Sequence, residues 1–176
     1  MQSQYMLESQ LALILAGLTP DNRLICRVML YTGLRIGDVL ALRRDQIKRV
    51  FSITEQKTGK RRRVGLSDQL ITEIIRRAGA SPWAFPSPHD PAKPRTRQAV
   101  WGDIHRTAKA LRLKVNAGTH SMRKNYAVDL MEKYGDIERV RKALNHSNPT
   151  VTVLYAMADQ LVCTYDERAK IYRRRR

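Results

Sequence analysis

Apolar residues recur at intervals of three or four along most of this sequence, which is the spacing that builds one buried face of an α-helix. The spacing changes to the two-residue period of β-strands in two short segments, residues 50–53 and 63–66, which flank a glycine suited to a tight turn, Gly59. We therefore expect a mainly α fold with a small antiparallel β-sheet, an α+β arrangement in which one hairpin interrupts a set of helices.

The ends of the expected helices are marked by capping residues. The helices cover roughly 7–18, 21–32, 35–43, 96–111, 120–134 and 159–172, and others follow Ser67, Gly135-Asp136 and Asn148-Pro149. Ser67 and Thr119 are expected N-caps, and Gly33 is expected to end the second helix. The proline-rich segment 79–98 is interpreted as a surface connection. Residues 1–176 should thus form a single domain ending in a helix and basic tail at 159–176.

The charge of the chain points to a polyanionic partner. The 176 residues include 33 Lys and Arg against 16 Asp and Glu, a net charge of +17. Nucleic acid is the commonest partner of so basic a protein. Hydrophobic residues make up 43% of the chain, which excludes a disordered basic tail. Composition alone leaves open a ribosomal protein, a membrane-surface binder or another soluble basic protein.

The cysteines and the apolar runs predict a cytoplasmic protein with no membrane partner. Cys26 and Cys163 both lie in apolar surroundings and are expected to be buried free thiols in a reducing compartment. The spacing of Cys and His residues does not match a zinc site. The longest apolar run, from Leu11 to Leu18, is too short to span a bilayer.

Six residues in a fixed order carry the candidate chemistry. In chain order they are Arg35, Lys57, His120, Arg123, His146 and Tyr155. The first arginine stands at a predicted helix start, and the lysine lies on the predicted hairpin. The first histidine and the second arginine form a His-Ser-Met-Arg motif, so they share one helix face. The second histidine precedes the tyrosine by nine positions.

This order resembles the tyrosine recombinases, also called phage-type integrases, whose pattern is arginine, hairpin lysine, His-x-x-Arg, histidine or tryptophan, then tyrosine. The resemblance covers about residues 7–165 and includes Tyr-Thr-Gly-Leu-Arg at 31–35, Lys-Thr-Gly at 57–59 and Leu-Asn-His-Ser at 144–147. A lone His-x-x-Arg occurs often by chance, so the signal lies in all six positions together. One departure is Asn145, where the family usually has glycine; asparagine tolerates the left-handed conformation of helix ends.

The resemblance implies an enzyme that cleaves and rejoins DNA through a 3′-phosphotyrosyl intermediate, with no metal, ATP or other cofactor. Tyr155 would be the nucleophile, and Lys57 would be the general acid that protonates the leaving 5′ oxygen. Arg35 and Arg123 can each grip phosphate oxygens bidentately and stabilise the extra charge of the transition state.

The other candidates are given supporting roles. His120 would act as a general base or as a donor to the phosphate, and His146 as a further donor. Asp38, one turn after Arg35, would orient that arginine. The basic residues of the hairpin are expected to contact DNA phosphates: Lys60, Arg61, Arg62 and Arg63.

The partners follow from the same resemblance. It implies double-stranded DNA, a homotetramer on paired DNA sites and a monomer without DNA. The DNA-clamping domain that usually precedes the catalytic domain is not expected here, because the catalytic pattern starts almost at Met1. The chain is then either an excised catalytic fragment, which we favour, or a naturally short form. Three other functions stay open: a type IB topoisomerase, a catalytically inactive integrase-like DNA-binding regulator, and a basic RNA-binding protein.

Overall fold

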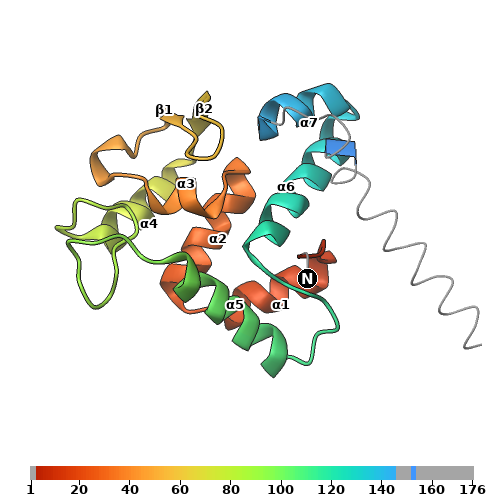
Figure 1. Cartoon of the computed structure of the whole chain (residues 1–176), viewed down its shortest axis with the longest axis horizontal. Coiled ribbons are helices and arrows are strands. Elements are labelled where there is room, and N and C mark those ends of the chain that lie inside the picture. Colours follow the sequence, from red (N-terminus) through yellow and green to blue (C-terminus); the bar gives the residue numbers. More distant parts are fainter. Residues whose placement is uncertain (1–2, 146–151, 154–176) are drawn as a thin grey trace, which may run out of the picture.

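A computed structural model describes residues 3–145 and 152–153 of the chain. These residues are mainly helical with one two-stranded antiparallel sheet, so the predicted fold class is confirmed (Figure 1). The predicted helices around Tyr155 and at 159–172 lie outside the described residues. The elements run α1 (Glu8–Gly17), α2 (Pro20–Thr32), α3 (Ile36–Leu40), the 3₁₀ turn η1 (Arg44–Gln46), β1 (Val50–Thr54), β2 (Arg61–Gly65), α4 (Asp68–Ala78), α5 (Arg97–Ala110), α6 (Thr119–Tyr134) and α7 (Ile137–Leu144).

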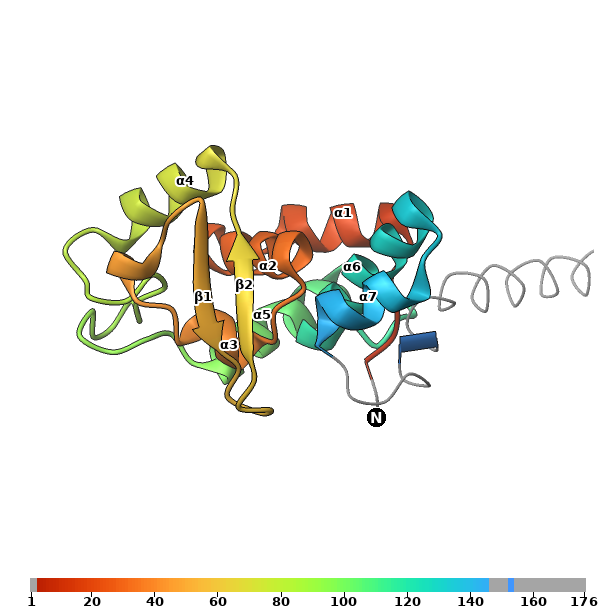
Figure 2. The same ribbon diagram turned by 90° about the horizontal axis from the view of Figure 1, so that it is seen from above.

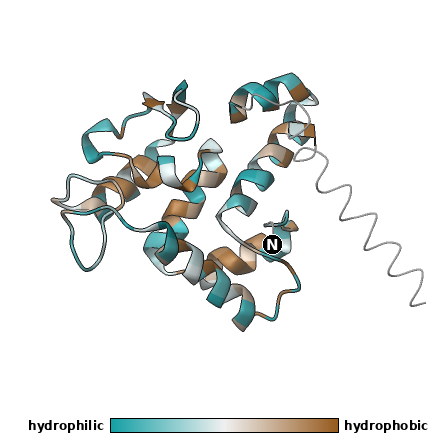
Figure 3. Ribbon diagram, viewed as in Figure 1, coloured by the Kyte–Doolittle hydropathy of each residue, from teal (hydrophilic) through white to brown (hydrophobic). Residues whose placement is uncertain are grey.

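The core is built around α2, which contacts α1, α3, α4 and α6. Its apolar residues Leu24, Ile25, Val28 and Met29 are all buried, as the helical spacing predicts. Figure 3 shows hydrophobic residues along the central helices, whereas α7 is largely hydrophilic on the side drawn. Each large aliphatic side chain buried in this way contributes about 1.5–3 kcal/mol. Burial of these side chains therefore holds α2 in the core.

The N-terminal end of α2 is held by a buried carboxylate on α5, that of Asp103. It accepts hydrogen bonds from the Thr19 backbone N–H at 3.1 Å, the Thr19 hydroxyl at 2.8 Å and the Asn22 amide at 2.7 Å.

Burial, helped by the Asp103 charge, raises the pKa of the Cys26 thiol to about 12. The expected buried free thiol is confirmed for Cys26, while Cys163 lies outside the described residues.

The C-terminal end of α2 is Gly33, as predicted. Its φ of +66° lies in the left-handed region, and its N–H donates to the Met29 carbonyl at 2.7 Å. A Cβ at this position would lie 2.3 Å from the ring of Tyr126 on α6. Only glycine therefore lets α6 cross so close to the turn that begins α3.

The two strands form a hairpin with an inner and an outer face. Their register runs from Val50 opposite Gly65 to Thr54 opposite Arg61, so β2 begins two residues before the predicted start. Side chains alternate between the faces: Arg61 and Arg63 are exposed on the outer face, and Val64 is buried on the inner face.

Two helix boundaries differ from the prediction. The helix expected over 35–43 ends at Leu40, because the backbone beyond it pairs with the proline-rich segment: the Ala84 N–H donates to the Leu42 carbonyl at 2.9 Å, and the Arg44 N–H donates to Pro82 at 2.9 Å. The helix expected to be capped by Thr119 instead begins there, and the preceding glycine is its N-cap.

Candidate active site

Arg123 is the most deeply buried of the four predicted catalytic residues that the structure describes. It is only 2% exposed, on α6. Its Nη1 donates to the Gly33 carbonyl at 2.5 Å, and its Nη2 donates to the Leu144 carbonyl. The guanidinium therefore joins the end of α2 to the end of α7. Because backbone carbonyls hold it from two sides, its position is fixed by the fold before any ligand arrives.

Arg35 lies at the N-cap of α3, immediately after the turn at Gly33. Its side chain is 17% exposed, and its Nη1 forms an ion pair of 2.8 Å with Oε2 of Glu55. Asp38 was predicted to orient Arg35, but the carboxylate that pairs with Arg35 is that of Glu55. The carboxylate of Asp38 instead accepts the backbone N–H of Gln56 at 2.9 Å, which ties α3 to the hairpin turn.

Glu55 is a fully buried carboxylate between β1 and the hairpin turn. Besides Arg35, it accepts hydrogen bonds from the Thr58 hydroxyl at 3.0 Å and the Asn145 amide at 3.2 Å, and it pairs with Arg62 at 3.4 Å. Burial alone would raise its pKa, but these donors and cations outweigh burial, and the pKa lies below its ordinary value. Glu55 is therefore ionised at neutral pH.

His120 stands in the first turn of α6, one turn before Arg123, with its side chain exposed. Its pKa lies below the ordinary value of 6.5, first through partial loss of hydration and then through the charges of Arg123, Arg35, Lys57 and Lys124. Arg123, Arg35 and Lys57 are thus each within electrostatic reach of His120. The lowered pKa also keeps the imidazole neutral at pH 7.

Lys57 lies in the exposed turn that joins the two strands. The turn is closed by the Glu55 N–H donating to the Lys60 carbonyl at 3.0 Å and the Gly59 N–H donating to the Glu55 carbonyl at 2.8 Å. Gly59 has a φ of +65°, as predicted for a tight turn. Lys57 is therefore carried on a defined backbone, while its side chain projects into solvent.

The end of α7 leads toward the last two predicted catalytic residues. Leu144 is buried, and its carbonyl is held by Arg123. Asn145 follows in the left-handed conformation, with a φ of 53°, which is the conformation that the sequence allows for it. His146 and Tyr155 lie outside the described residues, and their predicted roles stay predictions.

A basic pocket separates the hairpin from α7, which lie at the same end of the molecule (Figures 1 and 2). Its volume is about 460 Å³, and its cationic lining residues are Arg61, Arg62, Arg63, Arg139 and Lys142. Arg62 differs from its neighbours, because its side chain is only 10% exposed and donates to the Thr32 carbonyl as well as pairing with Glu55. Of the predicted phosphate contacts, Arg62 is thus used inside the protein, whereas Lys60, Arg61 and Arg63 face solvent.

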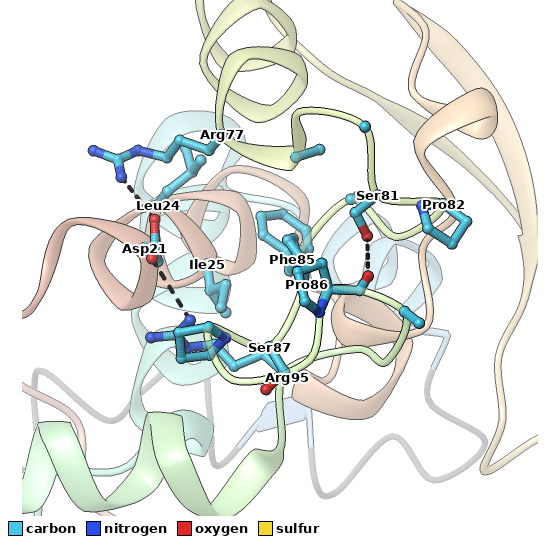
Figure 4. Close-up of a pocket in the computed structure, with 16 residues that line it drawn as sticks. Asp21, Leu24, Ile25, Arg77, Ser81, Pro82, Phe85, Pro86, Ser87 and Arg95 are labelled. Carbon is cyan, nitrogen blue, oxygen red and sulfur yellow. Dashed lines mark hydrogen bonds and ion pairs between the residues drawn. The ribbon is translucent and has the colours of Figure 1, made fainter.

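A second cavity, of about 550 Å³, lies apart from these residues (Figure 4). It is enclosed by the start of α2, the end of α4 and the proline-rich segment, with Leu24, Ile25 and Phe85 in its wall. Arg77 and Arg95 both reach Asp21 there, at 2.6 and 3.6 Å. None of the four predicted catalytic residues that the structure describes lines this cavity, so it is not the candidate active site.

Two further properties concern the described residues only. No helix in that part of the chain is long and apolar enough to cross a membrane. Nor do three His, Cys, Asp or Glu side chains gather there in an arrangement that could hold a metal ion.

The fold is that of tyrosine recombinase catalytic domains. The solved catalytic domain of bacteriophage HP1 integrase matches with a TM-score of 0.67 at 23% identity, covering 88% of both chains. A lambda integrase dimer bound to a core site matches with a TM-score of 0.73 at 18% identity, covering 89% of this chain and 48% of that one.

The sequence itself gives the family. Residues 4–161 match the profile described as the phage integrase family, and the chain belongs to that family. The integrase of Escherichia phage P2 is 29% identical over 157 residues, which cover 88% of this chain and 43% of that protein. The chain thus spans less than half the length of this relative.

Glu55, the carboxylate that pairs with Arg35, was not predicted from the sequence. It is the single acid between Asp45 and Asp68, inside the most basic stretch of the chain. The two-residue period also places it on the inner face, two positions after Ile53. An isolated acid facing inward among cations was the available signal for a buried ion-pair centre.

Proposed function

We propose that this chain is the catalytic domain of a site-specific DNA recombinase that cleaves and rejoins DNA through a 3′-phosphotyrosyl intermediate. The observation that carries the proposal is the gathering of Arg35, Lys57, His120 and Arg123 from α3, the hairpin and α6. Three cations around one neutral imidazole suit a phosphodiester, which is an anion whose negative charge grows in the transition state.

The proposed cleavage step transfers one phosphoryl group. The phenolic oxygen of Tyr155 attacks the phosphorus, and its proton passes to the neutral imidazole of His120. The bond from phosphorus to the 5′ oxygen breaks, and Lys57 donates a proton to that oxygen. Arg35 and Arg123 hold the non-bridging oxygens, and losing one such donor commonly slows a reaction by about 10²–10³. Rejoining runs these transfers in reverse, so the energy of the ester is conserved.

The proposed partner is double-stranded DNA, in the cytoplasm. The exposed side chains of Lys60, Arg61 and Arg63 beside the pocket support contacts to the DNA backbone, since phosphate contacts are made mostly by exposed Lys and Arg. The lambda integrase chain of similar fold is bound to its core site. We also propose that the chain acts as a homotetramer on paired sites and is a monomer without DNA.

The decisive experiment traps the covalent intermediate. The protein is incubated with a pool of duplexes that have random sequence around a nick, so that a short 5′ fragment diffuses away after cleavage. Covalently bound strands are isolated on a denaturing gel and sequenced. We expect an adduct that is lost in Tyr155→Phe and kept in the control Tyr165→Phe.

Each outcome of the trapping experiment supports or removes one of the assignments. An adduct that persists in Tyr155→Phe removes the nucleophile assignment. Binding of duplex DNA with no adduct from any sequence in the pool favours an inactive DNA-binding regulator. If adducts form, joining of two recovered sites separates a recombinase from a type IB topoisomerase, which would relax supercoiled plasmid without exchanging strands between sites.

A further inference from the structure

Glu55 brings together three segments that are far apart in the chain: the start of α3, the hairpin and the end of α7. Its carboxylate receives Arg35 from the start of α3, Thr58 from the hairpin turn and Asn145 from the end of α7. Arg62 of β2 completes the set at 3.4 Å. The first three donors reach the same oxygen, Oε2, so a shift of any one changes the environment of the others.

The hydrogen bond from the Asn145 side chain to Glu55 is a second observation, independent of the backbone conformation of Asn145. Asn145 ends α7 with a φ of 53° and a ψ of 37°, a conformation that glycine adopts without strain. The backbone geometry therefore does not require an amide side chain. The amide nevertheless donates to Glu55 at 3.2 Å, across 90 positions of sequence. It joins the end of α7 directly to the ion pair that holds Arg35.

We propose that Glu55, joined to α7 through Asn145, is a positioning residue for the phosphate-cleavage step. It sets where the Arg35 guanidinium and the turn carrying Lys57 stand relative to the end of α7. This inference rests on the proposed function. A guanidinium has five N–H donors, so the contact of its Nη1 with Glu55 is compatible with a second contact to phosphate. The carboxylate acts through these neighbours and does not touch the reacting atoms.

The geometry gives the expected size of the effects. Replacing a group that orients a metal ligand commonly costs about 10–100-fold in activity, and we expect a similar range for a group that orients a phosphate-binding arginine. Glu55→Gln keeps the shape but removes the charge, so we expect covalent adduct formation to slow by about 30-fold at saturating DNA. Asn145→Gly removes one neutral-donor hydrogen bond and keeps the left-handed backbone, so we expect about fivefold. The affinity for duplex DNA should change less than about twofold, because neither side chain is an exposed cation.

Asp103 offers a matched control. It too is a buried carboxylate with four hydrogen-bond donors, the fourth being Arg106 at 3.5 Å, but it lies at the other end of α2. The 13 residues of that helix separate it from the site by about 20 Å. Asp103→Asn should lower the melting temperature without slowing adduct formation per folded molecule.

The test is a double-substitution cycle on the covalent adduct. Single-turnover rates are measured for the wild type, Glu55→Gln, Asn145→Gly, the double variant and Asp103→Asn, at a temperature where circular dichroism shows each folded. If the contact carries the coupling, the double variant is no slower than Glu55→Gln alone. Fold-changes that multiply, or a Glu55→Gln rate equal to that of Asp103→Asn, would overturn the proposal. If Glu55→Gln does not fold, the Asn145→Gly variant alone tests the proposal. An unchanged rate of adduct formation in that variant would overturn the proposal.

A second readout separates this inference from the proposed function. Hydrogen exchange of the backbone amides in the turn at 56–60 needs neither DNA nor an active enzyme. Asn145→Gly should speed exchange of these amides, because Glu55 loses one of the donors that fix it, while Asp103→Asn should leave them unchanged. If the wild type forms no adduct, the proposed function fails, and the exchange result still decides whether the α7 end and the hairpin turn are coupled.

Discussion

Arg123 and Lys57 belong to two regions that present their charges in opposite ways. Arg123, on α6, is 2% exposed, and two backbone carbonyls hold its guanidinium. Lys57 stands in an exposed hairpin turn, which is fixed through its backbone, through Glu55 and through the hydrogen bond from the Gln56 N–H to Asp38. The charge of Arg123 is therefore held inside the fold, whereas that of Lys57 projects into solvent from a turn that two buried carboxylates hold.

The difference separates two tasks. Groups that stabilise charge on a phosphate act best when they are ordered before the substrate arrives, because no reorganisation is then needed during the reaction. A proton donor must reach a leaving oxygen and then exchange its proton with solvent, which an exposed lysine can do. The helical region fits the first task and the hairpin turn fits the second.

The largest expected effect tests whether Arg123 belongs to the fold as well as to the chemistry. Arg123→Ala leaves the carbonyls of Gly33 and Leu144 without this donor in a buried site, so we expect the free energy of unfolding to fall by about 3 kcal/mol. Cleavage should fall by about 10²–10³ with duplex binding retained. Urea unfolding and adduct formation measure the two effects, and an unchanged unfolding free energy would show that the buried contacts add nothing to stability.

Two of the left-handed glycines, one in each region, sharpen the same comparison. Gly33→Ala meets both an unfavourable φ and the ring of Tyr126, so it should lower the free energy of unfolding by about 3 kcal/mol. Gly59→Ala has a similar φ, but no atom lies within 4 Å of the added carbon, so about 1 kcal/mol is expected. Equal losses in urea unfolding would mean that the two regions are equally constrained.

Lys57→Ala should change activity with almost no change in stability. We expect adduct formation to slow by about 10²-fold, within the range for general-acid catalysis, while the melting temperature stays that of the wild type. A substrate whose leaving 5′ oxygen is replaced by sulfur needs no acid and should restore the rate. Lys60→Ala, the matched control, should need more DNA to reach saturation but should cut at the wild-type rate once DNA is saturating. Failure of the sulfur substrate to rescue Lys57→Ala contradicts the general-acid role.

The smallest effect concerns the titration of His120. Its folded pKa lies below 6.5, so between that pKa and 6.5 the unfolded chain binds more protons than the folded one. The free energy of unfolding should therefore rise as the pH rises through this window, and it should fall again as the pH falls through it. Urea unfolding from pH 5 to 7.5 measures the slope, and His120→Asn should remove this part of it. An identical slope in both proteins would mean that neither burial nor the neighbouring cations lower the pKa of the imidazole.

Local rules predicted the elements well, and the reason lies in particular residues. The helical spacing of Leu24, Ile25, Val28 and Met29 predicts burial on α2, and Gly33 and Gly59 mark turns that require a positive φ. These features depend on neighbours in sequence. The end of α3 was predicted too late because its backbone pairs with the segment at 82–84, some 40 positions away.

Site contacts were harder to predict for the same reason. The resemblance placed Arg35, Lys57, His120 and Arg123 in one site, and in the structure the three cations act electrostatically on His120. The partner of Arg35 was assigned to the acid one helical turn away, but the hairpin supplies it. Spacing along one helix shows which side chains share a face, and it carries no information about an acid from another element.

The inward orientation of Arg62 changes how the formal charge of +17 translates into DNA affinity. Electrostatic binding to a duplex draws its free energy from the small cations that leave the DNA as protein charges take their place. An arginine already neutralised by a buried carboxylate displaces none of them. The number of ions released should therefore follow the exposed Lys and Arg on the pocket side of the hairpin and fall well short of the total that composition suggests.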